Sequence, residues 1–308
     1  MPDSGIKWRE LLGELFSFCE MSPDYGGIIR GLVQDDIYVY AAGTATQTVR
    51  KYRKSDMALV GESPDYGGSI YALTQDATHV YAGGVTTQTV RKYLKSTMAL
   101  DGESPDYGGT IYALTQDDDY IYAGGSTTIK IRKYLKSNMT YDIESPSYGG
   151  TIYALIQDAT HVYAVGAVSQ QKVRKYLKST MALDGEGPDY TSTIYALTQD
   201  ANYVYAAGAG AHTIQKYLKS NMTLAEESPD YGGIVYALTQ DANYVYAGGA
   251  VTYTIRKYQK SDMSFVSESP SYGGDIRGLT QETNYVYAGG ATIQTVRKYA
   301  LRVVTPSG

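Results

Sequence analysis

Residues 63–103 read SPDYGGSIYALTQDATHVYAGGVTTQTVRKYLKSTMALDGE, and close variants of this unit fill most of the 308-residue chain. The proline of the opening phrase marks each copy, and successive markers lie 41 or 42 residues apart. The seven markers are Pro23, Pro64, Pro105, Pro146, Pro188, Pro229 and Pro270. A period near 41 is typical of solenoids and propellers, and it overrides the two domains of ~150 residues that length alone would suggest.

Each unit contains four short segments with strand character. In the quoted copy they are residues 69–75, 79–82, 89–95 and 98–102. The first is apolar on both faces, as in a strand packed between sheets, and Gly, Pro, Asp or Ser bounds each segment. The ~3.6-residue period of a helix is missing from every window of the unit. Four short antiparallel strands per unit predict the blade of a β-propeller.

The two ends of the chain indicate how the ring closes. The last unit stops after its third strand, at 295–299. The seventh blade therefore has a fourth strand only if residues 14–20 supply it. The seven first strands are 28–34, 69–75, 110–116, 151–157, 193–199, 234–240 and 275–281. An open array would expose two strand edges, so we predict an all-β, closed seven-bladed propeller with four antiparallel strands per blade. The N-terminal strand completes the last blade.

The chain is therefore expected to hold one propeller with short extensions at both ends. The predicted boundaries are an N-terminal extension at 1–13, the propeller at 14–304 and a C-terminal tail at 305–308.

Residues 202–206 (NYVYA) and 212–217 (HTIQKY) resemble the core of NHL-repeat propellers, and the units are more broadly similar to NHL, YVTN and quinoprotein-like propellers. The resemblance implies a propeller fold. Members of these families bind RNA or peptides, and a few are metal-dependent lyases. No activity transfers residue by residue, because glycine (Gly83, Gly124, Gly248) replaces the acidic residue that follows the Tyr-Val-Ala element of NHL repeats. The tryptophan and Gly-Lys signatures of quinoprotein repeats and the Trp-Asp of WD40 repeats are missing too.

Composition argues against several functional classes. The 27 basic and 32 acidic residues give a net charge of -5, the opposite sign to a bulk nucleic-acid binder, so no nucleic-acid partner is expected. The single cysteine, Cys19, allows no intrachain disulfide. No apolar run approaches the ~20 residues of a membrane span, and residues 1–4 open no signal peptide. We expect no membrane insertion, and a place in the cytoplasm or in a particle.

The sequence offers little material for catalysis. His79 and His161 occupy a slot that holds tyrosine in other blades, and His212 stands alone in a loop. No spacing of His, Cys and carboxylates forms a zinc site, and residues 117–119 lack the ligand pattern of a calcium loop. We therefore expect a non-enzymatic protein with no catalytic residues, metal or cofactor.

Tyrosine is the unusual residue, with 33 copies against 3 Phe and 1 Trp. One tyrosine per unit falls in the loop that joins successive blades: Tyr25, Tyr66, Tyr107, Tyr148, Tyr190, Tyr231 and Tyr272. Acidic residues flank each of them, and tyrosine is common in binding surfaces. One hypothesis is a Tyr- and acid-rich loop face that binds a protein, peptide or glycan. The alternative is that proline and tyrosine only lock each turn.

Two other repeated features are interpreted as structural. Tyr71, Tyr81 and Tyr93, with their equivalents, lie inside strands and are predicted to pack between blades, with hydroxyls that find polar partners. The Arg-Lys pairs of the third strands, such as Arg50-Lys51, are predicted to form a solvated outer wall with their aliphatic stems on the sheet.

The first and last units differ from the rest at one position. Arg30 and Arg277 stand where the other five units have tyrosine, each followed by a glycine that would give room, and ring closure makes these units neighbours. Buried guanidinium groups need acceptors, either Asp275 or an external carboxylate or phosphate. We treat Arg30, Arg277 and Asp275 as a candidate site at this seam. The alternative is that terminal repeats are atypical for stability alone.

Three functional classes follow. The first is a non-enzymatic binding or scaffold propeller, since similar blades offer equivalent sites and avidity. The second is a structural subunit of a larger assembly, such as a virion or surface appendage. The third, less favoured, is an enzyme with an anionic ligand at the blade 1/7 seam.

Overall fold

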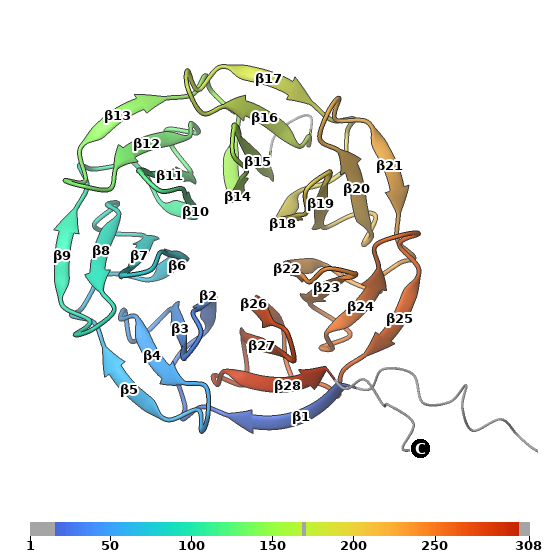
Figure 1. Ribbon diagram of the computed structural model, residues 1–308, viewed down its shortest axis with the longest axis horizontal. Coiled ribbons are helices and arrows are strands. Elements are labelled where there is room, and N and C mark those ends of the chain that lie inside the picture. The colour runs from blue at the N-terminus through green and yellow to red at the C-terminus, as the bar shows by residue number, and fades with distance from the viewer. Residues whose placement is uncertain (1–15, 168–170, 302–308) are drawn as a thin grey trace, which may run out of the picture.

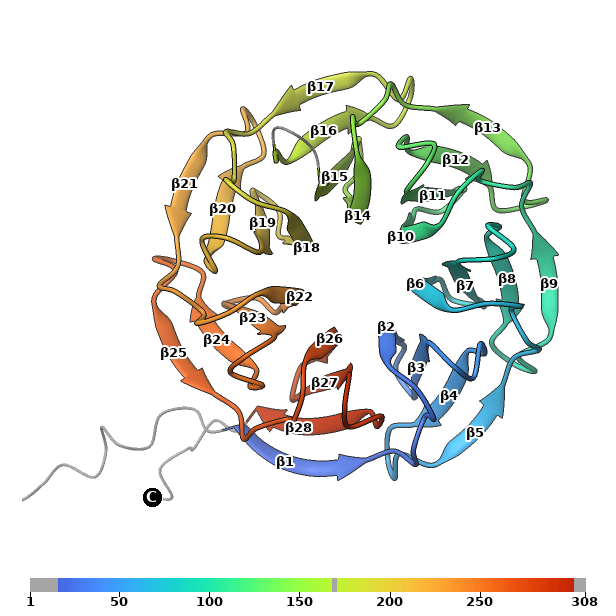
Figure 2. The same ribbon diagram turned by 180° about the vertical axis from the view of Figure 1, so that it is seen from behind.

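The computed structural model describes residues 16–167 and 171–301, which form seven four-stranded antiparallel sheets. The sheets stand like blades around a central axis (Figure 1). In both views the first strand of each blade lies nearest the axis, and the fourth strand forms the outer rim (Figure 2). No helix in the described ranges is long and apolar enough to cross a membrane.

The first four blades follow the chain, each as a meander from the axis outward. Blade 1 comprises β2 (Ile29–Gln34), β3 (Tyr38–Gly43), β4 (Arg50–Arg53) and β5 (Leu59–Glu62). Blade 2 comprises β6 (Ile70–Gln75), β7 (His79–Gly84), β8 (Arg91–Leu94) and β9 (Leu100–Glu103). Blade 3 comprises β10 (Ile111–Gln116), β11 (Tyr120–Gly125), β12 (Arg132–Leu135) and β13 (Tyr141–Glu144). Blade 4 comprises β14 (Thr151–Gln157), β15 (His161–Ala167), β16 (Arg174–Leu177) and β17 (Leu183–Glu186).

The last three blades include the one that both chain ends build. Blade 5 comprises β18 (Ile194–Gln199), β19 (Tyr203–Gly208), β20 (Ile214–Leu218) and β21 (Leu224–Glu227). Blade 6 comprises β22 (Val235–Gln240), β23 (Tyr244–Gly249), β24 (Arg256–Gln259) and β25 (Phe265–Glu268). Blade 7 comprises β26 (Ile276–Glu282), β27 (Tyr285–Gly290), β28 (Arg297–Leu301) and β1 (Phe16–Met21).

Ring closure by the N-terminal strand is confirmed. Strand β1 pairs antiparallel with β28, from Phe16 opposite Leu301 to Met21 opposite Arg297, and the sheet order is β1-β28-β27-β26. The structure describes this strand at residues 16–21, against the predicted 14–20, and residues 14 and 15 lie outside the described residues. The predicted extensions at 1–13 and 305–308 lie outside the described residues, and those boundaries stay predictions.

The hydrophobic core is divided among the junctions between blades. At the first junction, Tyr40 and Ala42 of β3 pack with Ile70 and Leu73 of β6 and with Val80 of β7. Close packing between blades explains why glycine stands where NHL repeats have an acidic residue. A Cβ on Gly83 would lie 2.6 Å from Cγ2 of the next blade's isoleucine, so that site has no room for a carboxylate.

The loops form two distinct faces. On the first, which we call the loop face, the connection between blades meets the loop between second and third strands, and Tyr66 N donates to Gln47 O at 2.8 Å. On the opposite face, which we call the turn face, the first and last turns of a blade meet, and Lys54 N donates to Ile37 O at 2.9 Å. Each innermost strand pairs on one side only, so its other edge faces the axial channel.

Deletion of residues 1–21 removes β1 and exposes the edge of β28, which invites pairing with other chains. The truncated protein is expected to aggregate, or to melt well below the full-length chain, in scanning calorimetry with light scattering. Deletion of residues 1–13 alone keeps β1 and serves as the control. A monomer with an unaltered melting temperature after the longer deletion would contradict closure by this strand.

Candidate functional site

The seven tyrosines predicted to line the loop face are fully buried. Tyr25, Tyr66, Tyr107, Tyr148, Tyr190, Tyr231 and Tyr272 each have 0% exposed surface. Each hydroxyl donates to a backbone carbonyl in its own junction, for example Tyr66 to Thr89 O at 2.6 Å and Tyr231 to Thr254 O at 2.8 Å. These rings therefore have no exposed surface with which to contact a ligand, and ligand binding by the loop face stays a prediction. Proline and, in six of the seven units, the two glycines after the tyrosine turn the chain so that the ring points into the core; Thr191 and Ser192 replace these glycines after Tyr190. This matches the alternative of a locked turn.

The third-strand arginines cover these rings from outside. The Arg50 guanidinium lies 5.3 Å from the centroid of the Tyr25 ring and donates to Tyr25 O at 2.9 Å. Its Nε also pairs with Glu62 at 3.0 Å. The neighbouring Lys51 is buried, and its Nζ donates to Lys95 O of the next blade at 2.7 Å. The expected solvated basic wall is therefore a set of partly buried contacts that hold blades together.

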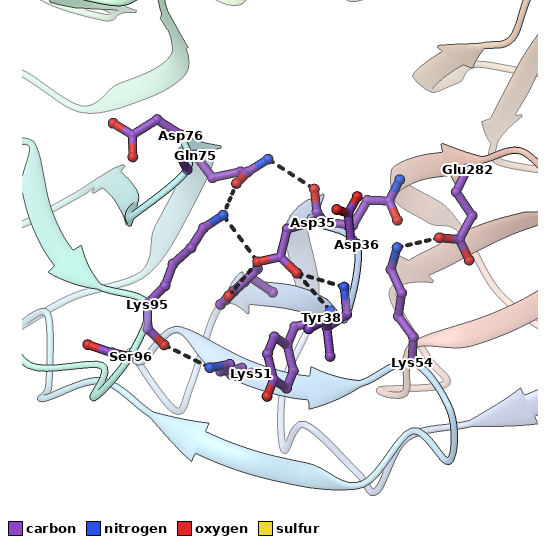
Figure 3. A pocket seen from close by; sticks show the side chains of 14 residues that line it. Asp35, Asp36, Tyr38, Lys51, Lys54, Gln75, Asp76, Lys95, Ser96 and Glu282 are labelled. Atoms are coloured by element: carbon purple, nitrogen blue, oxygen red, sulfur yellow. Dashed lines mark hydrogen bonds and ion pairs between the residues drawn. The ribbon is translucent and has the colours of Figure 1, made fainter.

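The turn face carries an open hollow of about 900 Å³ between blades 1 and 2, which Glu282 of blade 7 also lines (Figure 3). Lys95 of blade 2 reaches back across this junction to Asp35 at 3.1 Å and also donates to Gln75. The Asp35 carboxylate accepts the Tyr38 amide at 2.8 Å, and Gln75 Nε2 donates to Gln34 O of blade 1 at 3.0 Å. We call this set of lysine, aspartate and glutamine contacts the junction tie. Its polar groups satisfy one another, which is typical of a structural element.

The lysine–carboxylate part of the junction tie recurs around the ring. Its equivalents are Lys136–Asp76 at 3.1 Å, Lys178–Asp117 at 2.9 Å, Lys219–Asp158 at 3.4 Å and Lys260–Asp200 at 3.5 Å, and Lys54 pairs with Glu282. At the junction of blades 6 and 7, Leu301 takes the lysine position. It packs with Phe16 and Tyr246 in an apolar cluster.

The junction tie shifts the ionisation of its carboxylates. Burial alone would raise the pKa of Asp158, but hydrogen bonds from the Thr160 amide, the Tyr163 hydroxyl and the His161 amide, with the nearby Lys219 ammonium, lower that pKa to about 2. Burial and the bond to this carboxylate raise the pKa of Tyr163. The aspartates of the ties are therefore ionised at neutral pH and structural in role.

A different group of side chains lines the axial channel at the loop face. We call it the collar, and it consists of Arg30, Tyr71, Tyr112, Tyr153, Tyr195, Tyr236 and Arg277, which enclose a cavity of about 250 Å³. A second cavity of about 200 Å³ continues along the channel, lined additionally by the Ala, Gly and Leu residues of the same strands. The tyrosines equivalent to Tyr71 were predicted to pack between blades. They are only partly buried and face the channel instead.

The collar rings form a continuous aromatic row. Successive centroids, from Tyr71 to Tyr236 through Tyr112, Tyr153 and Tyr195, lie 5.0, 5.4, 5.2 and 5.4 Å apart. An arginine caps each end of the row, because the guanidinium of Arg30 lies 4.9 Å from the Tyr71 centroid and that of Arg277 3.7 Å from the Tyr236 centroid. These are cation–π distances.

The two arginines meet at the blade 1/7 seam. Arg277 pairs with Asp275 at 2.8 Å, whereas no ion pair involves Arg30 in the described part of the chain. In both residues Nε is buried without a hydrogen-bond acceptor among the described residues. Burial lowers the pKa of Arg30, the Tyr71 ring opposes this shift, and the charge of Arg277 adds to it. A Cβ on Gly31 would lie 3.0 Å from Leu73, so the seam glycine makes room for the neighbouring blade rather than for the channel.

The histidines belong to ordinary blade contacts. Nε2 of His79 bonds Asp101 at 3.0 Å, and its Nδ1 bonds Thr78 at 2.7 Å; His161 has the same arrangement. In the described ranges, no group of three or more His, Cys, Asp or Glu could hold a metal ion.

Comparison with known proteins supports the fold. No family model matches the chain, and no curated protein matches it. The computationally designed Ika8 protein is 17% identical, with a TM-score of 0.73 over 94% of this chain and 99% of that one. The WD40 β-propeller domain of Doa1 is 11% identical, with a TM-score of 0.81 over 94% of this chain and 98% of that one. This chain is a seven-bladed β-propeller. At such low identity the two likenesses speak for the fold alone.

Replacement of Tyr66 by phenylalanine removes a buried hydroxyl and its hydrogen bond to the Thr89 carbonyl. We expect the free energy of unfolding to fall by about 1–2 kcal/mol in chemical denaturation. Tyr141→Phe is the matched control, because its side chain is 46% exposed, and it should change stability by less than about 0.5 kcal/mol. Equal effects of the two changes would contradict the structural role of Tyr66.

Acid should weaken the junction ties. The folded pKa of Asp158 is about 2 and the unfolded value is ~3.9, so its stabilisation is complete only above about pH 5 and is mostly lost as pH falls to 2. We expect Asp158→Asn to flatten the decline of unfolding free energy between pH 4 and 2 by about 1 kcal/mol, reduced by solvent screening. An unchanged slope in acid titrations of stability would contradict this role.

Proposed function

We propose that the protein is a non-enzymatic binding propeller whose ligand site is the collar, and that the ligand presents an anionic group to Arg30 and Arg277. One observation carries this proposal. Five blades place tyrosine in the collar, and only at the seam do two arginines replace it. Each of these arginines has a buried Nε–H that lacks an acceptor among the described residues. A buried donor without a partner is costly unless a ligand or water supplies the acceptor.

The chemistry of the collar supports binding rather than catalysis. The residues that line the cavity are tyrosine and arginine, which stack on planar groups and recognise carboxylates or phosphates through paired N–H donors. Propellers often serve as interaction scaffolds, and ligands commonly enter concave sites of this kind. An acidic peptide or protein segment fits the collar better than a neutral glycan, because a neutral glycan brings no charge.

A structural role is the second candidate, and one observation favours it. The outer strand of every blade bears one large apolar side chain that is 40–47% exposed. These residues are Phe18, Leu59, Leu100, Tyr141, Leu183, Leu224 and Phe265. Seven evenly placed apolar contacts on the rim would suit lateral packing in an assembly.

The double variant Arg30→Tyr with Arg277→Tyr tests the binding proposal. We expect at least a tenfold loss of affinity for both benzoate and phenyl phosphate in isothermal titration calorimetry. The melting temperature should not fall, because five blades already carry tyrosine at this position.

Arg53→Tyr is the control, since Arg53 lies at the exposed end of a third strand and pairs with Asp56. It should bind both probes as the parent does. If the parent binds neither probe, or if the double variant binds as tightly as the parent, the collar is not an anion site. Such a result would favour the role as a structural subunit of an assembly.

A further inference from the structure

We propose that Asp275 makes the collar selective for planar monocarboxylates over dianionic phosphates. This inference rests on the proposed function, because it concerns the ligand class of the same site. It assigns to Asp275 a role in specificity that its uncharged counterparts in the other blades cannot have. Those counterparts are Ile28, Ser69, Thr110, Thr151, Thr193 and Ile234.

The first argument is the charge at the seam. Arg30 and Arg277 bring two positive charges, and the carboxylate of Asp275 stands 2.8 Å from Arg277. No carboxylate is among the residues that line the collar, and Asp275 acts on it through its pair with Arg277. The seam therefore has one net positive charge, which one carboxylate neutralises. A phosphate monoester carries nearly two negative charges above its second pKa of ~6, so its second charge would stand unpaired near Asp275.

The second argument is the unequal state of the two arginines. Asp275 immediately precedes β26 and stands two residues before Arg277, and its carboxylate reaches the Arg277 guanidinium. Asp275 occupies Nη2 of Arg277, and the same guanidinium lies over the Tyr236 ring. Arg30 keeps its donors for a ligand. One free guanidinium can hold a carboxylate through two parallel N–H···O bonds, whereas Arg277, with Nη2 occupied by Asp275, has fewer donors left for the second charge of a phosphate.

The third argument is the shape of the collar. The cavity of about 250 Å³ is bounded by five tyrosine rings in a row, and these rings offer edges and faces to a flat group. Aromatic pairs at such distances attract one another beyond the area they bury. Two kinds of ligand would fit: an aryl carboxylate, or a peptide in which an acidic residue stands beside an aromatic one. The flat group would lie against the tyrosine rings, and the carboxylate would pair with Arg30.

The test compares benzoate with phenyl phosphate at pH 8 by isothermal titration calorimetry on the full chain. The parent should bind benzoate at least threefold more tightly than phenyl phosphate. Asp275→Thr, which installs a residue already used in other blades, should raise affinity for phenyl phosphate at least tenfold and for benzoate less than threefold. Asp275→Asn keeps the side-chain shape and should act in the same direction, which covers the case in which the threonine variant does not fold.

Asp36→Ser is the matched control. It makes the same change in net charge, but Asp36 is exposed on the turn face at the far end of the channel. It should leave the ratio of the two affinities unchanged. The same gain in phosphate affinity in this control would reduce the effect to net charge and overturn the role of Asp275.

The outcomes separate the inference from the function on which it rests. If both Asp275 variants keep the parental ratio while the double arginine variant loses both probes, the selectivity role is wrong and the collar remains an anion site. A parent that prefers phenyl phosphate also overturns the inference. If the double arginine variant binds both probes normally, both proposals fail together.

Discussion

The junction tie is the interaction on which the arrangement of this propeller depends. A lysine after one blade's third strand reaches the aspartate of the preceding blade, as Lys95 reaches Asp35. A glutamine of the lysine's blade also donates to a backbone carbonyl of the preceding blade, as Gln75 does to Gln34 O. The pair is partly buried, so breaking one partner leaves a charge that water reaches poorly. The tie recurs at six of the seven junctions, and the apolar cluster around Leu301 takes its place between blades 6 and 7. Each blade is thus held to its neighbour, and the seven innermost strands line one channel. The collar exists only because those strands are held in this order.

Much of the fold could be predicted from the sequence, because a repeat constrains the whole chain at once. The proline spacing defined the blades, and the count of first and fourth strands required residues near Phe16 to close the ring. The burial of individual tyrosines could not be predicted in the same way. Tyrosine suits both a surface and a core in which its hydroxyl finds a carbonyl, and only the backbone course of the Pro-Asp-Tyr-Gly-Gly turn decides that Tyr25 points inward.

The collar shows a second limit of sequence reasoning. The first strand is apolar on both sides, so the alternation in Ile70-Tyr71-Ala72 does not reveal that the tyrosine faces the axis while its neighbours face other blades. The substitution of arginine at this position was the available signal. It directed attention to Arg30, Arg277 and Asp275, which lie at one seam, and among the described residues only Arg277 has a carboxylate as partner. That these residues bind a ligand stays a proposal. In a nearly symmetric ring, the position that breaks the symmetry is the best place to look for a ligand.

The claim that Arg30 and Arg277 form an anion site can be tested without knowing the natural ligand. Crystals soaked in sodium bromide and measured at the bromine absorption edge reveal bound anions directly in an anomalous difference map. The account predicts a peak inside the collar, within hydrogen-bond distance of the Arg30 guanidinium and on the side away from Asp275. A channel without such a peak, with the Arg30 guanidinium bonded to protein acceptors, would contradict it.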